Sequence, residues 1–256
     1  MDVYCCQYEI VWEDRPANHA IVKRMLDTGR PDPGSLIVLP EMFDTGFSQH
    51  FDSLLQGAGC SVPFLQDLAE CYSCGVIAGL VAAAENGKAY NRAVLVRPGN
   101  EPVLSFDKMY PFSPSQEGQY VLPGDEVAVW PYGGLNIAPA VCYDLRFPEL
   151  FREALDRGAN LFVVPANWPA HRWMHWMALL RARAIENQSW VIGVNRVGSD
   201  PHFEFMGHSV VFDPEGVPVA KAASAEQLLV AQIDPQAVER AREKFPAVKD
   251  RRRGGR

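Results

Sequence analysis

Three reactive side chains each stand at the end of a predicted β-strand: Glu41, Lys108 and Cys142. Strand ends are where α/β folds gather their catalytic groups. Taken one at a time, such residues are more often a loop carboxylate, a surface ion-pair partner and a small core side chain. Their interest therefore lies in the chemistry that the three can perform together.

A thiol, a carboxylate and an ammonium group make an activated nucleophile. A free cysteine has a pKa of about 8.5 and reacts poorly while protonated. Glu41 can take the proton of Cys142, and Lys108 favours first the thiolate and then the oxyanion of a tetrahedral intermediate. The backbone N–H of Tyr143 follows the nucleophile directly and can be a second oxyanion donor. The combination indicates nucleophilic acyl transfer at Cys142.

The segments around these residues resemble the nitrilase superfamily of carbon–nitrogen hydrolases. Pro40-Glu41-Met42-Phe43 is similar to the glutamate motif of that family, Asp107-Lys108 to its lysine motif, and residues 142–149 (CYDLRFPE) to its cysteine motif. The order of the motifs along the chain also agrees, and residues 181–187 and 207–209 fit as well.

The resemblance implies an α/β fold built as a four-layer α-β-β-α sandwich. It implies Glu41 as general base, Lys108 as oxyanion stabiliser and Cys142 as nucleophile, with no metal or organic cofactor. The family carries a second glutamate in the loop after the lysine, and Glu117 stands at the matching place. This residue is expected to hold Lys108 and to help position substrate or water.

The flanking residues are most similar to the omega-amidase branch, which hydrolyses short dicarboxylic monoamides such as 2-oxoglutaramate and succinamate. Asn167 and Trp168 belong to one such flank, residues 166–169 (ANWP). The branch that hydrolyses N-carbamoyl amino acids (β-ureidopropionate among them) has Asn where this chain has Tyr143, but it remains an alternative. Tyr110 replaces the usual His two residues after the lysine, and the following loop also differs. A non-catalytic member that binds a metabolite or a partner protein is the alternative from another class.

Several nearby side chains have two interpretations. Arg146 can clamp a substrate carboxylate through two hydrogen bonds, or it can pair with Asp144 or Glu149 and brace the turn, and bracing is favoured. Phe43 and Trp168 either line the pocket or pack in the core. Tyr110, Asn167 and the Tyr143 backbone complete the predicted substrate-binding set.

Two histidines give an alternative that involves a metal. His171 and His175 are one helical turn apart, which suits zinc, but the intervening residues Arg172, Trp173 and Met174 supply no acid. The Cys71–Cys74 pair has no second C-x-x-C partner, so packing is the favoured interpretation. The sequence therefore favours the thiol mechanism, with no metal site.

Hydrophobic patterning predicts that strands and helices alternate along the chain. Residues 172–187 are expected to form a helix with Met174, Leu180 and Ile185 packed inward, and residues 109–124 to form a long loop of the kind that often has a function. Strands are predicted at residues 2–8, 35–39, 76–84, 90–97, 102–106, 135–141, 161–164, 190–195, 208–212, 217–221 and 227–233. Further helices are predicted at residues 16–26, 62–74, 148–157 and 235–244.

Composition limits the remaining possibilities. Twenty-four Lys and Arg against 31 Asp and Glu give a net charge of −7, which disfavours a nucleic-acid surface. Six scattered cysteines and the absence of a signal-like or membrane-spanning segment lead us to expect a cytoplasmic protein. Residues 1–256 are expected to form one domain with a flexible basic tail at 249–256. The resemblance implies a homo-oligomer, a dimer across the helix at 148–157 and the C-terminal segment.

Overall fold

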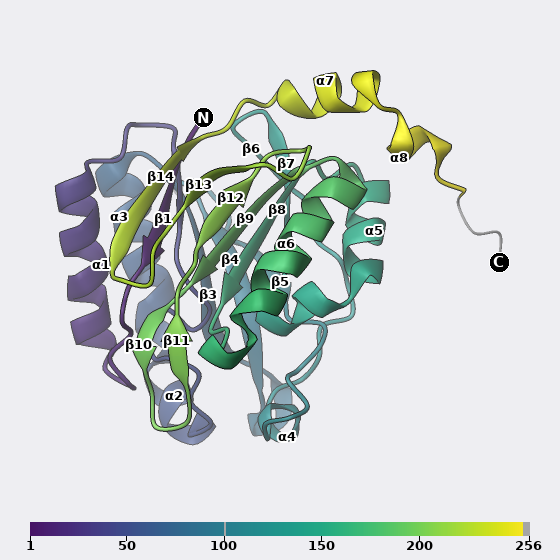
Figure 1. Cartoon of the computed structure of the whole chain (residues 1–256). Helices are drawn as coiled ribbons and strands as arrows, with labels where there is room; N and C mark the ends of the chain where they lie inside the picture. Colours follow the sequence, from purple (N-terminus) through teal and green to yellow (C-terminus); the bar gives the residue numbers. More distant parts are fainter. Residues whose placement is uncertain (100, 253–256) are drawn as a thin grey trace.

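The computed structural model describes residues 1–99 and 101–252. Two six-stranded sheets stack face to face, and helices cover both outer faces (Figure 1). The expected four-layer α-β-β-α sandwich is therefore confirmed. The first sheet has the order β14-β1-β2-β3-β4-β5, formed by Gln227–Gln232, Asp2–Gln7, Leu36–Val38, Gly75–Ala83, Ala89–Val96 and Leu104–Asp107. The second has the order β13-β12-β9-β8-β7-β6, formed by Pro218–Lys221, Val210–Phe212, Trp190–Asn195, Leu161–Ala166, Leu135–Pro139 and Trp130–Tyr132.

Each sheet has three parallel strands at its centre and antiparallel strands at its margins. The parallel trio is β1-β2-β3 in the first sheet and β7-β8-β9 in the second. Strands buried on both faces require continuous apolar runs, and Leu36, Ile37 and Val38 are all fully buried. The carboxyl ends of the parallel strands are where loops with functional residues are expected.

Four helices form the outer layers. The first sheet is covered by α1 (Arg15–Gly29) and α3 (Ser61–Tyr72), the second by α5 (Pro148–Asp156) and α6 (Trp173–Asn187) (Figure 1). Local chemistry sets their ends: the Asp14 carboxylate caps α1 by accepting the Ala17 N–H at 3.0 Å, and Pro148 opens α5. Shorter helices are α2 (Phe51–Gly57), α4 (Glu117–Tyr120), α7 (Ala237–Lys244) and α8 (Ala247–Asp250).

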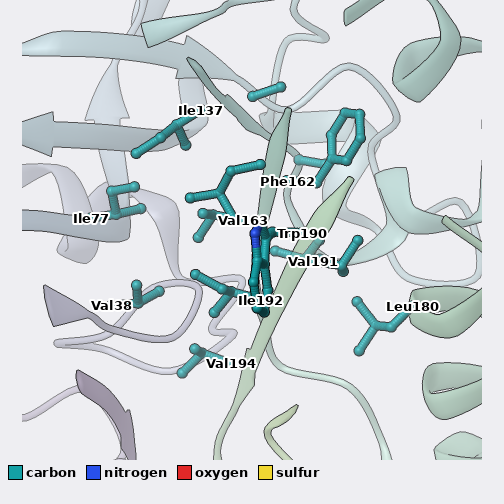
Figure 2. Packing of buried hydrophobic residues seen from close by; sticks show 14 of the residues in the cluster. Val38, Ile77, Ile137, Phe162, Val163, Leu180, Trp190, Val191, Ile192 and Val194 are labelled. Atoms are coloured by element: carbon teal, nitrogen blue, oxygen red, sulfur yellow. The ribbon is translucent and has the colours of Figure 1, made fainter. Parts of the chain in front are cut away.

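The main core lies between the two sheets. Val38 and Ile77 of the first sheet belong to one buried cluster with Ile137, Val163 and Ile192 of the second (Figure 2). A fully buried aliphatic side chain contributes about 1.5–3 kcal/mol relative to an exposed one. This core therefore fixes the two sheets against each other, and with them the loops at their edges.

The structure corrects the expected packing of α6. Leu180 is buried as predicted, but Met174 and Ile185 are 66 % and 50 % exposed. The inward stripe is Trp176, Leu180 and Ala184, spaced four residues apart along one face. The sequence also missed short elements, including β6 and the hairpin of β10 (Val197–Ser199) and β11 (Glu204–Met206), because such segments carry little periodicity.

Among the described residues, no helix is long and apolar enough to cross a bilayer. Of the basic tail, residues 253–256 lie outside the described part of the chain.

Candidate active site

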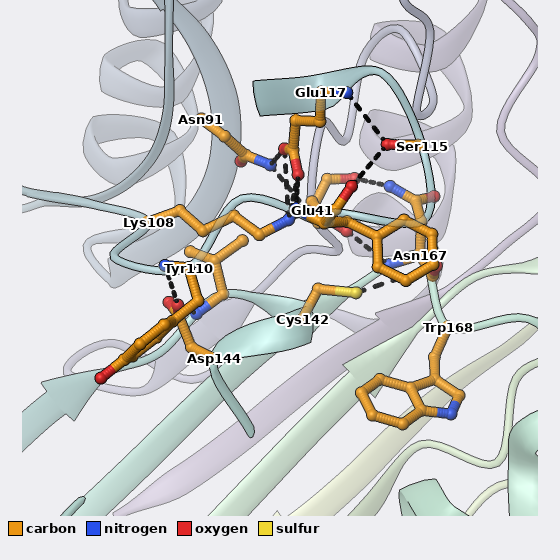
Figure 3. Close-up of polar contacts among 12 residues, drawn as sticks. Glu41, Asn91, Lys108, Tyr110, Ser115, Glu117, Cys142, Asp144, Asn167 and Trp168 are labelled. Atoms are coloured by element: carbon orange, nitrogen blue, oxygen red, sulfur yellow. Dashed lines mark hydrogen bonds and ion pairs between the residues drawn. The ribbon is translucent and has the colours of Figure 1, made fainter. Parts of the chain in front are cut away.

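Strand ends from both sheets meet at one point (Figure 3). Glu41 lies three residues after β2 and Lys108 directly after β5, both in the first sheet. In the second sheet, Cys142 lies three residues after β7, and Asn167 directly follows β8. The predicted gathering of Glu41, Lys108 and Cys142 is thus present in the geometry, and Glu117 at the start of α4 joins them.

Lys108 is a buried cation held between two buried carboxylates. Its Nζ lies 3.0 Å from Glu41 Oε1, and 3.2 and 3.0 Å from the two oxygens of Glu117, with all three side chains fully buried. Burial disfavours the charged lysine, but the Glu117 and Glu41 carboxylates outweigh it and hold the pKa of Lys108 above its ordinary value. Lys108 therefore stays positively charged.

The Glu41 carboxylate receives donors from three directions. Asn91 Nδ2 lies 2.7 Å and Lys108 Nζ 3.0 Å from Oε1, while the Asn167 N–H donates to Oε2 at 2.9 Å. The Asn167 side chain also donates to the Glu41 backbone carbonyl at 2.7 Å. These contacts tie the end of β8 in the second sheet to the loop after β2 in the first.

The loop that carries Glu41 is tightly folded. Met42 adopts a left-handed backbone with φ of 43°, which is unfavourable for a residue with a side chain. The loop lies directly on β3, where the Phe43 N–H donates to the Gly79 carbonyl at 3.0 Å. A Cβ on Gly79 would come within 2.7 Å of Glu41 Cα, so only glycine permits this approach.

Cys142 begins a short 3₁₀ turn (Cys142–Arg146) and also has a positive φ, 47°. Its Sγ lies 3.9 Å from the Asn167 carbonyl oxygen. Burial, followed by the nearby Glu41 carboxylate, raises the pKa of Cys142 well above its ordinary value, although the Lys108 charge acts in the opposite direction. The thiol is therefore protonated in the resting site and needs a base before it can react.

Asp144 links the loop after Lys108 to the strand before Cys142. It accepts the Tyr110 N–H at 2.9 Å and the Val141 N–H at 2.8 Å, and burial raises its pKa to about 7. The expected pairing of Arg146 with Asp144 or Glu149 is wrong. In the described part of the chain Arg146 makes no ion pair with any acid, and its guanidinium lies instead over the Tyr143 and Trp168 rings.

Glu41, Lys108 and Cys142 line one pocket of the molecule. Its walls are largely aromatic, and Arg146 and Arg172 add positive charge. The Arg146 guanidinium lies 4.8 Å from the centre of the Trp168 ring, and that of Arg172 lies 5.9 Å from the Phe112 ring. The remaining wall residues are Phe47, Tyr143, Asn167, Pro169, Phe203 and Phe205.

Four of the six predicted substrate-binding residues line this pocket: Tyr143, Arg146, Asn167 and Trp168. Two do not. Phe43 is fully buried in the core beneath α1 and α3, where its ring stacks with His19. Tyr110 stacks on Phe147 with ring centres 3.7 Å apart, so its ring packs beside the end of the turn Cys142–Arg146. Its backbone N–H donates to Asp144.

Sequence reasoning missed several neighbours of the site. Asn91 contacts both Glu41 and Glu117. The sequence contains a signal for it, because Ala89, Asn91 and Ala93 are alternate residues of one strand and share its inward face. In the sequence, Arg172 is distinguished only by its position between two histidines. Phe203 and Phe205 come from the β10–β11 hairpin, a segment without a clear pattern.

The histidine pair does not form a metal site in this geometry. The described residues contain no group of three or more His, Cys, Asp or Glu arranged to hold a metal ion. His175 Nδ1 instead lies 3.5 Å from Arg146, and His171 stacks near Phe203. A cation beside His175 opposes the binding of a second cation.

Comparison with known proteins agrees with the motifs. The profile of the family described as Carbon-nitrogen hydrolase matches residues 3–243. The chain is 39 % identical over 249 residues to "Omega-amidase YafV" of Escherichia coli (strain K12), covering 95 % of this chain and 94 % of that one. It is 32 % identical over 253 residues to "2-oxoglutaramate amidase" of Bacillus subtilis (strain 168), covering 98 % and 97 %.

The fold has a near match among solved structures. The protein XC1258 from Xanthomonas campestris, described as a CN-hydrolase superfamily protein with an arsenic adduct in its active site, superposes with a TM-score of 0.92. It is 30 % identical, and the match covers 100 % of this chain and 98 % of that one. With its three motifs, its fold and these relatives in agreement, this chain belongs to the carbon–nitrogen hydrolase family of the nitrilase superfamily.

Proposed function

We propose that this carbon–nitrogen hydrolase acts as an omega-amidase, converting short dicarboxylic monoamides such as 2-oxoglutaramate and succinamate to dicarboxylates and ammonia. The names of two relatives, an omega-amidase and a 2-oxoglutaramate amidase, support this substrate class. The observation that carries it is the pair Arg146 and Arg172 in the same pocket as Cys142. Neither guanidinium has an ion-pair partner among the described residues, so both are available to a substrate carboxylate.

In the proposed mechanism, Glu41 takes the proton of Cys142, and the thiolate attacks the amide carbon. Lys108 and the Tyr143 N–H stabilise the oxyanion of the tetrahedral intermediate. Glu41 then passes the proton to the leaving nitrogen, so ammonia departs and a thioester remains. A water molecule that Glu41 deprotonates attacks the thioester, the C–S bond breaks to release the acid, and Glu41 returns the proton to the Cys142 thiolate. The raised pKa of Cys142 supports the need for Glu41, and the contacts of Glu117 with Lys108 support a role in holding the cation.

We also propose that residues 1–256 act as one domain that assembles as a homo-oligomer. The family match over residues 3–243 and the core shared by both sheets support the single domain. Phe245 of the C-terminal segment is exposed and its carbonyl accepts from Gln188 just after α6, where Ile185 is also exposed, so these residues support an interface that includes the C-terminal segment. The six free thiols support a cytoplasmic, reducing location.

The test is ammonia release from succinamate, 2-oxoglutaramate, glutamine, N-carbamoyl-β-alanine and the neutral analogue butyramide. We expect rapid release from the first two and none with Cys142→Ala. Arg146→Gln and Arg172→Gln should each lower kcat/KM for succinamate about 10–100-fold, the loss of a charged hydrogen bond, and hardly change it for butyramide. Release from N-carbamoyl-β-alanine alone would replace the substrate class, and turnover by Cys142→Ala would refute the thiol mechanism.

A further inference from the structure

Asn91 is a buried amide at the centre of the charged site. It lies on β4 and is fully buried, and its Nδ2 donates to Glu41 Oε1 at 2.7 Å and to Glu117 Oε1 at 2.8 Å (Figure 3). Its backbone carbonyl accepts the Lys108 N–H at 2.8 Å. One residue therefore contacts the carboxylates of Glu41 and Glu117 and the backbone of Lys108.

The other polar atom of the Asn91 side chain makes no comparable contact. Its Oδ1 is buried and has no hydrogen-bond partner among the described residues. An unsatisfied buried acceptor costs about 1–3 kcal/mol, so the oxygen of the side chain gives no reason for asparagine at this position. The opposite orientation of the amide would direct its oxygen at two carboxylates. The two N–H donors are thus the feature that distinguishes asparagine at this position.

Two carboxylates that share a buried site repel each other, and the repulsion turns their side chains apart or favours a shared proton. Lys108 and Asn91 both donate to Oε1 of Glu41 and to Oε1 of Glu117. With the Asn167 N–H on Oε2, the plane of the Glu41 carboxylate is fixed by donors on both oxygens.

We infer that Asn91 is a positioning residue for the hydrolysis: it bridges Glu41 and Glu117 so that Glu41 is held in place as a base for Cys142. Asn91 is not part of the pocket wall, so it acts through Glu41 and Glu117 and not through the substrate. The inference rests on the proposed role of Glu41. It predicts an effect on the proton-transfer steps and not on substrate binding.

The test is Asn91→Asp, which keeps the shape and removes the donors. At pH 7.5 we expect kcat to fall about 100-fold, the effect of a misplaced catalytic group, with KM for succinamate nearly unchanged. The loss should shrink as the pH is lowered, because a protonated carboxyl at this position regains one donor. Alkylation of Cys142 by iodoacetamide should be slowed with the same pH trend, and this readout needs no substrate.

The matched control is Asn187→Asp at the end of α6. Asn187 is also fully buried and also has an unpartnered Oδ1, but its Nδ2 donates to the Arg183 carbonyl at 2.9 Å, away from the pocket. This variant should lose stability and keep the wild-type kcat and pH profile. If Asn91→Asp fails to fold, Asn91→Ser repeats the test without a new charge and should lower kcat at unchanged KM.

Some outcomes would overturn the inference. If Asn91→Asp has the kcat and the alkylation rates of the wild type, Asn91 does not position Glu41. A loss of kcat that does not change with pH and equals that of Asn187→Asp would show the same. If the wild type releases no ammonia from the amide panel, the proposed substrate class fails. The alkylation experiment then still decides the role of Asn91.

Discussion

Lys108 is a fully buried cation whose partners are two fully buried carboxylates. Moving such charges out of water is unfavourable unless they remain paired, so each member of the trio depends on the others. Asn91, Asn167 and the Phe112 N–H supply the remaining donors to the two carboxylates. The stability of the site therefore depends on the same charged groups that perform its chemistry.

Lys108→Met tests this balance. Removing the cation leaves Glu41 and Glu117 buried without a charge partner, and we expect the free energy of unfolding to fall by about 3–5 kcal/mol, with loss of turnover. Adding Glu117→Gln to the same chain should recover part of the stability and none of the activity. Urea unfolding at neutral pH gives the measurement. Equal stability of the single and double variants would contradict the charge-balance argument.

Asp144 gives the stability a pH dependence of defined sign. Burial raises its pKa from 3.8 to about 7, so between these values the folded chain binds more protons than the unfolded chain. The contribution of Asp144 to the free energy of unfolding is fully present below about pH 4 and is lost as the pH rises through 7. Asparagine does not titrate, so the unfolding free energy of the wild type minus that of Asp144→Asn should decrease from pH 5 to pH 8. A constant difference would show that Asp144 ionises normally.

At the scale of elements, the loops that carry the reactive groups lie closely against neighbouring strands. The Glu41 loop rests on Gly79 of β3, and both Met42 and Cys142 hold left-handed backbones that the surrounding structure must enforce. Small shifts of these strands therefore move Glu41 relative to Cys142.

A single methyl group should be enough to show this dependence. Gly79→Ala forces the Glu41 backbone away from β3, and we expect kcat/KM to fall about 100-fold, as for a displacement of about 1 Å. Gly59→Ala is the control, since a Cβ there meets no atom within 4 Å and its φ is not in the left-handed region. The comparison uses kinetics together with thermal melting. Wild-type kinetics for Gly79→Ala would mean that the loop tolerates the shift.

The long elements and the three motifs were predictable from the sequence, because apolar runs such as residues 35–39 and the spacing around Cys142 are local patterns. The partners of those motifs were not. Asn91 lies 50 residues from Glu41 along the chain, and the Arg146 guanidinium lies over the Tyr143 and Trp168 rings and not beside the neighbouring acids. The choice between pocket and core for Phe43, and the place of the Tyr110 ring, depend on packing across the sheets, which decides which side of a loop faces a cavity.

For the whole molecule, the exposed apolar side chains of Ile185 and Phe245 are the basis of the proposed interface between copies. We expect the chain to form dimers or larger assemblies in solution, and Ile185→Glu with Phe245→Glu to shift it toward the monomer, because charged groups are depleted in the centre of interfaces. Val230→Glu is the control, as Val230 is equally exposed but lies on β14 of the other sheet. Light scattering after size exclusion gives the mass. A wild-type chain that is monomeric at micromolar concentration would contradict the proposal.

The active site joins two sheets: Glu41 belongs to one and Cys142 to the other, and Asn167 connects them across 126 residues of sequence. During synthesis on the ribosome the glutamate therefore emerges long before the cysteine, and the contacts that unite them need residues beyond 166. A nascent or partly unfolded chain can contain both Glu41 and Cys142, but it does not hold the base against the thiol. Amide cleavage is thereby confined to the finished fold, and the unfinished enzyme is harmless to the amides of its surroundings.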